Sequence, residues 1–175
     1  GITMFFMDRG IDSGDIIAQK KTKIQDSDNI TDLKRSINCL AVELIAENIR
    51  SVLKGTVKRI KQPIEATYGC QRIPDDGKID WGRDSKYISN LIRASEPSYP
   101  AFTFLNSKKL FILEAELVDK TIYYGTIGQV AMPLKDESVI VITGDGALKI
   151  KKIKMENESP VTPKTYLNSS KIRLT

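Results

Sequence analysis

The sequence has 175 residues, of which 41% are hydrophobic and 28% charged, and its formal net charge is +5. These values suffice for one ordinary domain or two small ones with a buried core, and they exclude a disordered tail. No apolar run approaches the roughly 20 residues of a membrane-spanning helix, so we expect a cytoplasmic protein without membrane contact.

The chain begins with an apolar run, residues 2–7, that is typical of a strand buried on both faces. Because there is no methionine before this run, we expect the sequence to be the C-terminal part of a longer protein. A loop bracketed by Gly10 and Gly14 follows, and its acidic residue is Asp12. On its own, the Asp-Ser-Gly sequence at this point is typical of a turn. A second short strand is predicted over residues 15–19.

Residues 29–54 have the spacing of a long amphipathic helix. Apolar residues recur every three or four positions; they are Ile30, Leu33, Ile37, Leu40, Leu44, Ile45, Ile49, Val52 and Leu53. Asp28 or Asn29 can cap the first turn, and Gly55 can end the helix. The two cysteines lie in unlike contexts, one inside this helix and one beyond it, so neither a disulfide nor a zinc site is predicted.

A basic and loop-rich stretch follows this helix. We therefore place a linker at residues 63–80, between a first domain part at 1–62 and a second domain at 81–175. The basic residues at the start of the stretch are Lys54, Lys58, Arg59 and Lys61. They can bind phosphate, but a solvated surface next to a helix C-terminus is the simpler interpretation.

A short helix is predicted over residues 85–94, because apolar residues have helical spacing there and Pro97 and Pro100 follow. Trp81 and Tyr87 can stack on a nucleobase. An aromatic residue in this position is more often part of a core, and we favour that interpretation.

From residue 101 onward the hydrophobic period changes to two, which predicts at least five short strands. The alternating pairs are Phe102/Phe104, Phe111/Leu113, Ile127/Val130, Val139/Val141 and Leu148/Ile150. Short strands at close spacing suggest a small antiparallel barrel of the OB type. We expect the three phenylalanines to belong to its core. We also expect Gly144-Asp145-Gly146 to form a tight turn in which a side chain at Gly146 would be destabilising.

Taken in order, these features resemble the folate-dependent formyltransferases, of the sugar-nucleotide N-formyltransferase and methionyl-tRNA formyltransferase type. The residues that carry the resemblance are 1–8, 10–16, Ile79-Asp80-Trp81, Ile92-Arg93-Ala94 with Pro97 and Pro100, and Gly144-Asp145-Gly146. The resemblance implies an α/β + β fold. It consists of the C-terminal part of a Rossmann-like formyltransferase domain, followed by a small OB-like antiparallel barrel.

The resemblance also implies a catalytic role for Asp12. Together with Asp8, Arg9, Gly10 and Ile11, it would bind the co-substrate 10-formyltetrahydrofolate, without a metal. When an amine attacks a formyl carbon, the intermediate needs stabilisation of its oxyanion and a proton acceptor. In the family a histidine of an upstream Asn-x-His segment works beside this carboxylate, which raises the pKa of the imidazole. The chain has no histidine, so we expect the fragment alone to be inactive.

Three further residues, Arg72, Pro74 and Asp75, are candidates for substrate binding. They belong to an Arg-x-Pro-Asp-Asp run before the tryptophan. This run resembles the corresponding segment of enzymes that formylate amino sugars on nucleotide carriers. We therefore expect a nucleotide amino sugar as acceptor, with initiator tRNA as the alternative. The same run also fits a proline-fixed turn with capping acids. An interpretation of another class is a non-catalytic OB-type module that binds nucleotide or nucleic acid. The sequence leaves the oligomeric state open.

Overall fold

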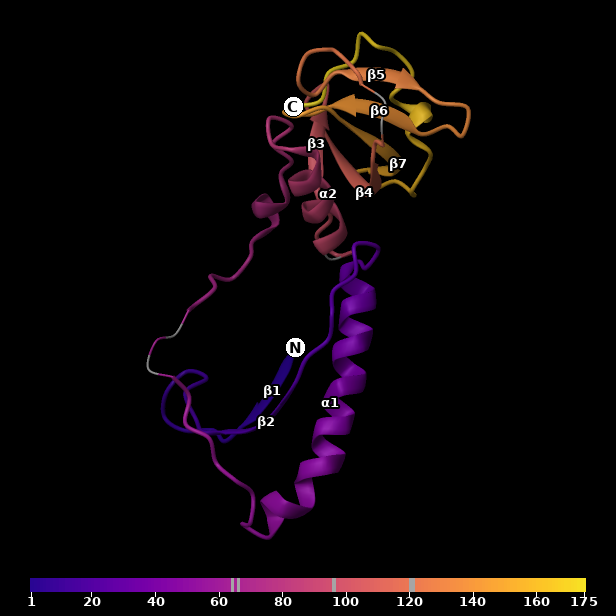
Figure 1. The fold of residues 1–175 in the computed structure, drawn as a ribbon. Coiled ribbons are helices and arrows are strands. Elements are labelled where there is room, and N and C mark those ends of the chain that lie inside the picture. The colour runs from indigo at the N-terminus through magenta and orange to yellow at the C-terminus, as the bar shows by residue number, and fades with distance from the viewer. Residues whose placement is uncertain (64, 66, 96, 120–121) are drawn as a thin grey trace. The chain divides into compact units, whose positions relative to one another are not determined.

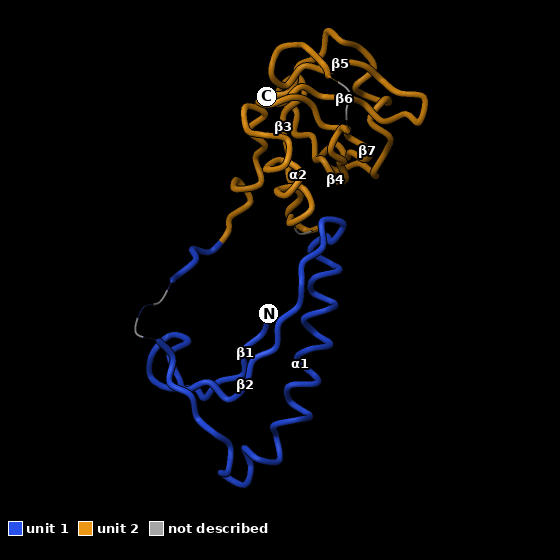
Figure 2. Tube along the Cα trace, viewed as in Figure 1, with its two compact units in different colours: residues 1–71 blue, residues 72–175 orange. Residues whose placement is uncertain are grey.

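The structure, a computed structural model, describes residues 1–63, 65, 67–95, 97–119 and 122–175. The chain divides into two compact units, residues 1–71 and residues 72–175 (Figure 1 and Figure 2). The boundary falls inside the stretch predicted as a linker. Among the described residues, no helix is both long and apolar enough to cross a membrane.

The first unit consists of a β-hairpin and one long helix. Its elements are β1 (Ile2–Phe5), β2 (Ile16–Lys20) and α1 (Ile30–Leu53). The strands pair antiparallel, and α1 contacts both. The Asn29 side chain caps α1 by accepting from the N–H groups of Thr31 and Asp32, and the Asp32 carboxylate accepts from the N–H of Asn29. The predicted helix and its cap are thereby confirmed.

The prediction that the first strand is buried on both faces is wrong for the described chain. Ile2, Met4 and Phe5 are half-buried, and Thr3 is exposed. The described pairing of β1 is with β2 alone, and one helix cannot cover both faces of a two-stranded sheet. The parallel strands of a Rossmann-like domain are not among the described elements, and that assignment stays a prediction.

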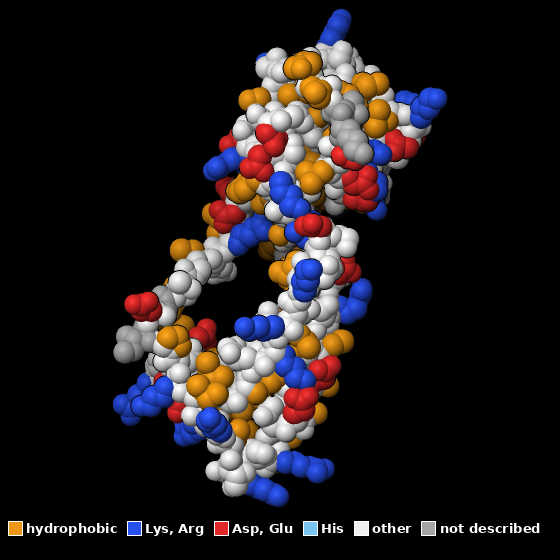
Figure 3. Space-filling model, in the orientation of Figure 1, with side chains coloured by type: hydrophobic (Ala, Val, Ile, Leu, Met, Phe, Trp, Pro, Cys, Tyr) orange, Lys and Arg blue, Asp and Glu red, His pale blue; other side chains and the backbone are white. Residues whose placement is uncertain are grey.

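The helix α1 carries a second row of apolar residues that is exposed. Their spacing alternates between three and four positions, which places them on one side of the helix; they are Cys39, Val42, Ala46, Ile49 and Leu53. Val42 and Leu53 are 69% and 79% exposed. We call this row the exposed α1 seam. Hydrophobic side chains are visible at the surface of this unit in Figure 3.

The second unit is built on a five-stranded antiparallel sheet, as predicted, with the strand order β3-β4-β7-β6-β5. Its elements are a 3₁₀ turn η1 (Pro74–Gly77), α2 (Ser85–Ala94), β3 (Phe102–Leu105), β4 (Lys108–Leu117), β5 (Val130–Pro133), β6 (Val139–Ile142), β7 (Ala147–Met155) and a second 3₁₀ turn η2 (Pro163–Thr165). The short helix matches its predicted range. The OB-like label stays a prediction.

Residues 172–175 connect the two edge strands of this sheet. The backbone of Thr175 exchanges two hydrogen bonds with Phe104 of β3, with N–O distances of 2.8 and 3.2 Å. On the other side, Val130 of β5 donates to the carbonyl of Ile172 at 3.0 Å, and Leu174 donates to the carbonyl of Gly128 at 2.8 Å. This segment therefore satisfies backbone groups on both edges of the sheet.

The core of the second unit lies between the inner face of the sheet and α2. Leu110, Ile112 and Ile88 are among its members. Trp81 is 3% exposed, and its Nε1 donates to Thr103 Oγ1 at 2.9 Å, which confirms that it belongs to the core. Tyr87 does not belong to the core, contrary to expectation. It is 48% exposed on α2, because the buried face of that helix is taken by Ile88 and Ile92.

Two of the three phenylalanines of the sheet, Phe104 and Phe111, do not belong to the core, contrary to expectation. Phe111 lies between two core residues of β4, so it points to the outer face of the sheet. Phe102 is its cross-strand partner, and Phe104 lies two residues further along the same strand. Phe102 is 4% exposed and is one of the buried core residues, as expected, whereas Phe104 and Phe111 are only half-buried.

The turn at residues 144–146 is confirmed, with Thr143 N–H donating to the Gly146 carbonyl at 3.0 Å. The glycine that excludes a side chain is, however, Gly144. A Cβ on Gly144 would lie 2.0 Å from the carbonyl oxygen of Gly82, whereas a Cβ on Gly146 would meet no described atom within 4 Å. The expectation for Gly146 was wrong because the close contact comes from a distant segment.

Candidate functional site

The loop that joins β1 to β2, residues 8–14, holds all five residues predicted for catalysis and folate binding. Asp8 shapes this loop: its Oδ1 accepts from the Ser13 hydroxyl at 2.7 Å and from the Gly10 N–H at 2.9 Å. These two donors, the hydroxyl first, lower the pKa of Asp8 below its usual value. Asp8 and Gly10 thus serve the loop conformation itself.

The two ends of the loop approach each other closely at Gly14, which is buried. A Cβ on Gly14 would lie 1.6 Å from the carbonyl oxygen of Phe6, so only glycine fits there. Gln62 anchors the loop from outside, since its Nε2 donates to the carbonyls of Asp12 at 2.8 Å and Gly14 at 2.7 Å. The role of Gln62 was missed, because no local sequence pattern links residues this far apart.

Asp12 lies at the exposed tip of this anchored loop. Its φ of 52° is in the left-handed region, which Asp and Asn tolerate better than most residues. No hydrogen bond or ion pair of the described residues involves its carboxylate. Next to it, Ile11 is 81% exposed and Arg9 is exposed as well. The loop therefore presents a carboxylate, a guanidinium and an apolar side chain to whatever binds there.

Arg59 supports the strands on either side of the loop. Its Nε lies 3.1 Å from Asp15 Oδ2, and its guanidinium carbon lies 4.3 Å from the centroid of the Phe6 ring. The three lysines of the same basic cluster, at positions 54, 58 and 61, are exposed. Arg59 thus has a structural role at the base of the loop.

The residues predicted for substrate choice belong to the second unit. Pro74 begins η1, and the Asp76 carboxylate accepts from the N–H of Ile73 at 2.8 Å. Arg72 Nη2 donates to Ser95 Oγ at 3.1 Å, and Ser95 follows α2. These contacts form the proline-fixed turn with a capping acid that was the alternative interpretation. Asp75 is exposed in the same turn.

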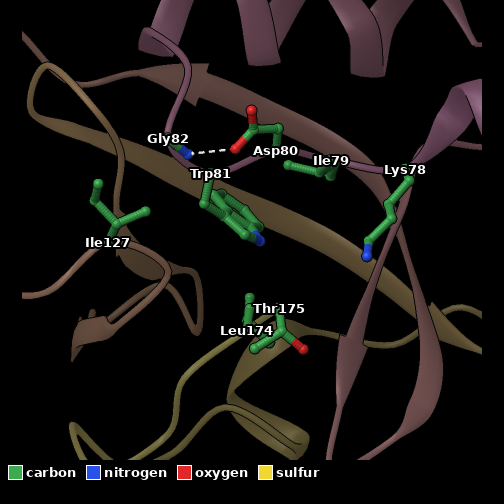
Figure 4. Close-up of a pocket in the computed structure, with 8 residues that line it drawn as sticks. All are labelled: Lys78, Ile79, Asp80, Trp81, Gly82, Ile127, Leu174 and Thr175. Carbon is green, nitrogen blue, oxygen red and sulfur yellow. Dashed lines mark hydrogen bonds between the residues drawn. The ribbon is translucent and has the colours of Figure 1, made fainter.

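A hollow of about 400 Å³ lies beside Trp81 (Figure 4). Figure 4 shows Lys78 and Ile127 on opposite sides of the indole, and the Asp80 carboxylate accepting from the Gly82 N–H at 2.9 Å. The inner walls of the hollow are core side chains, and the indole N–H already donates a hydrogen bond to Thr103. The hollow therefore offers few free polar groups for chemistry. No cluster of His, Cys, Asp and Glu among the described residues could hold a metal ion.

Comparisons with known proteins agree with one family. Residues 72–171 match the formyl transferase C-terminal domain. A methionyl-tRNA formyltransferase of Thermodesulfovibrio yellowstonii is 34% identical over 172 residues, which are 98% of this chain and 54% of that protein. The chain spans about half the length of the curated relatives it matches.

Solved structures show a similar fold. HypX from Aquifex aeolicus in complex with tetrahydrofolic acid has a TM-score of 0.69 at 21% identity, over 93% of this chain and 29% of that one. An N-formyltransferase from Helicobacter canadensis in complex with folinic acid and dTDP-3-aminofucose has a TM-score of 0.57 at 22% identity, over 88% and 55% of the two chains. At these identities the likeness extends to the fold alone.

Proposed function

Because this chain belongs to the formyl transferase family, we propose that it is the C-terminal part of a longer enzyme that transfers a formyl group from 10-formyltetrahydrofolate to a primary amine. The observation that carries the proposal is the anchored loop at residues 8–14, which holds at its tip the Asp12 carboxylate, without a partner among the described residues. The relatives align over 98% of the chain, so the likeness includes this loop.

In the proposed reaction, the amine nitrogen attacks the formyl carbon and forms the new C–N bond. The tetrahedral intermediate carries an oxyanion and a protonated nitrogen. The nitrogen loses its proton, the bond from the formyl carbon to the folate nitrogen breaks, and the folate nitrogen takes a proton. Asp12 would stabilise the charged form of a histidine supplied by the remaining part of the enzyme, because an adjacent carboxylate raises the pKa of an imidazole.

The loop residues have a chemistry that fits a folate. A pterin ring is flat and carries several N–H groups. These groups can donate hydrogen bonds to backbone carbonyls and carboxylates. The exposed side chain of Ile11 can pack against such a ring, and Arg9 can pair with a carboxylate of the folate tail. In this proposal Asp8 and Gly10 hold the loop in the conformation that binds the ring.

For the acceptor, we propose methionyl-tRNA. This choice is supported by the relatives, which align over nearly the whole chain and are named methionyl-tRNA formyltransferases. A nucleotide amino sugar is the second candidate, and it depends on Arg72, Pro74 and Asp75. The contacts of Arg72 with Ser95 and of Asp76 with Ile73 account for that segment without a substrate.

Formylation assays on the complete enzyme would test both acceptors. We expect transfer to the initiator methionyl-tRNA, with KM rising steeply with salt because many phosphates are contacted. Arg72→Ala should leave that KM unchanged. Formylation of a uridine- or thymidine-diphosphate amino sugar, with a KM that rises in Arg72→Ala and no transfer to tRNA, would decide for the second candidate. The 175-residue chain alone should transfer no formyl group to either.

A further inference from the structure

Two carbonyl groups of the loop at residues 8–14 are held by one side chain from outside the loop. Gln62 Nε2 donates to the Asp12 carbonyl at 2.8 Å and to the Gly14 carbonyl at 2.7 Å. Both partners are acceptors, so the contact requires the two N–H groups that a single amide nitrogen carries. Gln62 therefore sets the orientation of the peptide planes that follow Asp12 and Gly14.

The backbone of Asp12 needs such support. Its φ of 52° lies in the left-handed region, where a residue other than glycine stays only if the surrounding structure holds it there. Asp8 holds the neighbouring residues from inside the loop, by accepting from the Gly10 N–H and the Ser13 hydroxyl. Gln62 is the side chain that holds the backbone of Asp12 itself.

Gln62 is in turn held in place by the segment to which it belongs. Two residues earlier, Ile60 exchanges two backbone hydrogen bonds with Ile16, the first residue of β2, at 2.7 and 3.0 Å. The next residue, Pro63, disfavours a helical backbone at Gln62. The amide therefore reaches the loop from a fixed point beside β2.

The direction of the Asp12 side chain follows from this backbone geometry. Rotation about φ and ψ is the main freedom of a residue between two planar peptides, so fixing the peptide planes also fixes the Cα–Cβ bond. The contact that orients the Asp12 carbonyl thus limits the directions that its carboxylate can take. Such limits matter for catalysis, because a displacement of about 1 Å can lower a rate by about 100-fold.

We propose that Gln62 is a positioning residue for Asp12, which keeps the carboxylate in the direction that formyl transfer requires. The inference rests on the proposed function, since it gives Gln62 a part in that same reaction. Gln62 acts through the backbone of the loop and needs no contact with the acceptor. Its loss should therefore lower kcat without raising the KM for the acceptor.

Steady-state formylation of initiator methionyl-tRNA by the complete enzyme tests this role. Gln62→Met keeps the length of the side chain but removes both donors, and should lower kcat by about 10-fold to 100-fold, with KM for the tRNA within about twofold. Gln62→Glu keeps the shape but turns acceptor oxygens toward two carbonyls, so it should lose at least as much.

The first unit offers a matched control for these variants. Gln19 Nε2 donates to Thr3 Oγ1 at 2.9 Å across the same hairpin, outside the loop. Gln19→Met therefore removes a glutamine hydrogen bond of similar length without touching Asp12. It should keep the kcat of the parent enzyme, and its melting temperature should match that of Gln62→Met.

A double-mutant cycle separates positioning from a general effect on the fold. The variant with both Asp12→Asn and Gln62→Met should have a kcat within about twofold of Asp12→Asn alone, because no carboxylate is left to position. A crystal structure of Gln62→Met provides a measurement independent of activity. It should show Asp12 outside the left-handed region.

The outcomes distinguish this inference from the proposed function. A parental kcat in Gln62→Met, together with a large loss in Asp12→Asn, would overturn the inference and leave the proposed function standing. Additive losses in the double variant, or an unmoved Asp12 in the crystal structure of Gln62→Met, would overturn the inference as well. Parental activity of Asp12→Asn would contradict the proposed role of Asp12, and the inference would fail with it.

Discussion

The carboxylate of Asp12 is exposed and has no described partner, so its charge can be removed without disturbing the fold. In the complete enzyme, Asp12→Asn should lower kcat/KM for formyl transfer by about 100-fold or more, because the amide cannot support a charged histidine. The melting temperature should stay the same. Asp15→Asn, which alters the acid paired with Arg59 below the loop, is the control and should keep most of the activity. An active Asp12→Asn enzyme would remove Asp12 from the mechanism.

Gly144 and Gly146 flank the same residue but differ in the space around them. Gly144→Ala should destabilise the second unit by about 1–3 kcal/mol, because the added Cβ would overlap a backbone oxygen that cannot move freely. Gly146→Ala should change the unfolding free energy by less than about 0.5 kcal/mol. Urea denaturation of both variants measures the difference. Equal stability of the two would show that the segment around Gly82 adjusts easily.

The Asp145 side chain connects the turn between β6 and β7 to the start of α2 through hydrogen bonds. Its Oδ1 accepts from Ser85 N–H at 2.8 Å, Ser85 Oγ at 2.9 Å and Thr143 Oγ1 at 3.1 Å. The Ser85 N–H is the main reason that the pKa of Asp145 is lowered. Asp145→Ala leaves these donors without their acceptor and should cost about 1–3 kcal/mol of unfolding free energy.

Asp145→Asn keeps an oxygen in the same place, so it should cost less than Asp145→Ala. Thermal unfolding followed by circular dichroism compares the two variants. If both lose the same stability, the negative charge near the helix N-terminus, rather than the acceptor, is what matters.

The ion pair of Lys149 with Asp136 connects β7 to the turn before β6, and it sets a pH dependence. Lys149, followed by the hydroxyl of Ser138, lowers the pKa of Asp136 to about 2. Because the folded pKa is depressed, the stabilisation is complete above about pH 4 and is lost as the pH falls toward 2. An NMR titration of the Asp136 carboxyl should give this low pKa, and Lys149→Met should raise it toward 3.8. If the pKa of Asp136 stayed at about 2 in Lys149→Met, the ion pair with Lys149 would be contradicted.

The helices and strands were predictable because their signals are local. The spacing of apolar residues identified α1 and α2 nearly to the residue, and the alternation after residue 101 identified the strands. The same alternation could not tell the inner face of β3 from the outer one. Each side of that strand carries at least one large apolar residue, and a period of two fixes only which residues share a face. Phe104 and Phe111 were therefore expected in the core, although they are only half-buried on the outer face of the sheet.

The candidate site was predictable only in part. Asp12 and its loop stood out through the resemblance to a family. The anchoring by Gln62 did not, because its bonds to Asp12 and Gly14 span 50 and 48 residues. Contacts between residues so far apart depend on the tertiary fold, which neither secondary-structure propensity nor the spacing of apolar residues encodes.

The two units differ in how many hydrophobic side chains they bury. Among the described residues of the first unit, the buried hydrophobic side chains are Ile17 and Leu44, whereas the second unit has an extended core cluster. Residues 72–175 alone should therefore unfold in one cooperative transition. Residues 1–71 alone should show no such transition and should bind a hydrophobic dye through the exposed α1 seam.

Calorimetry of the two separate pieces measures this difference. The proposed function supplies the reason for it, since the remaining part of a longer enzyme would cover the seam and complete the first unit. Adding that part should suppress dye binding. A cooperative transition of residues 1–71 on their own would contradict both the stability argument and this role of the seam.

The pairing of residues 172–175 with β3 and β5 bears on how the protein is made. A ribosome delivers this segment after all five strands of the sheet, so a nascent second unit has two open sheet edges throughout its translation. Open edges invite pairing with other chains. Residues 172–175 are therefore required to close this unit, and a chain cut before residue 172 should aggregate through the two open edges of its sheet.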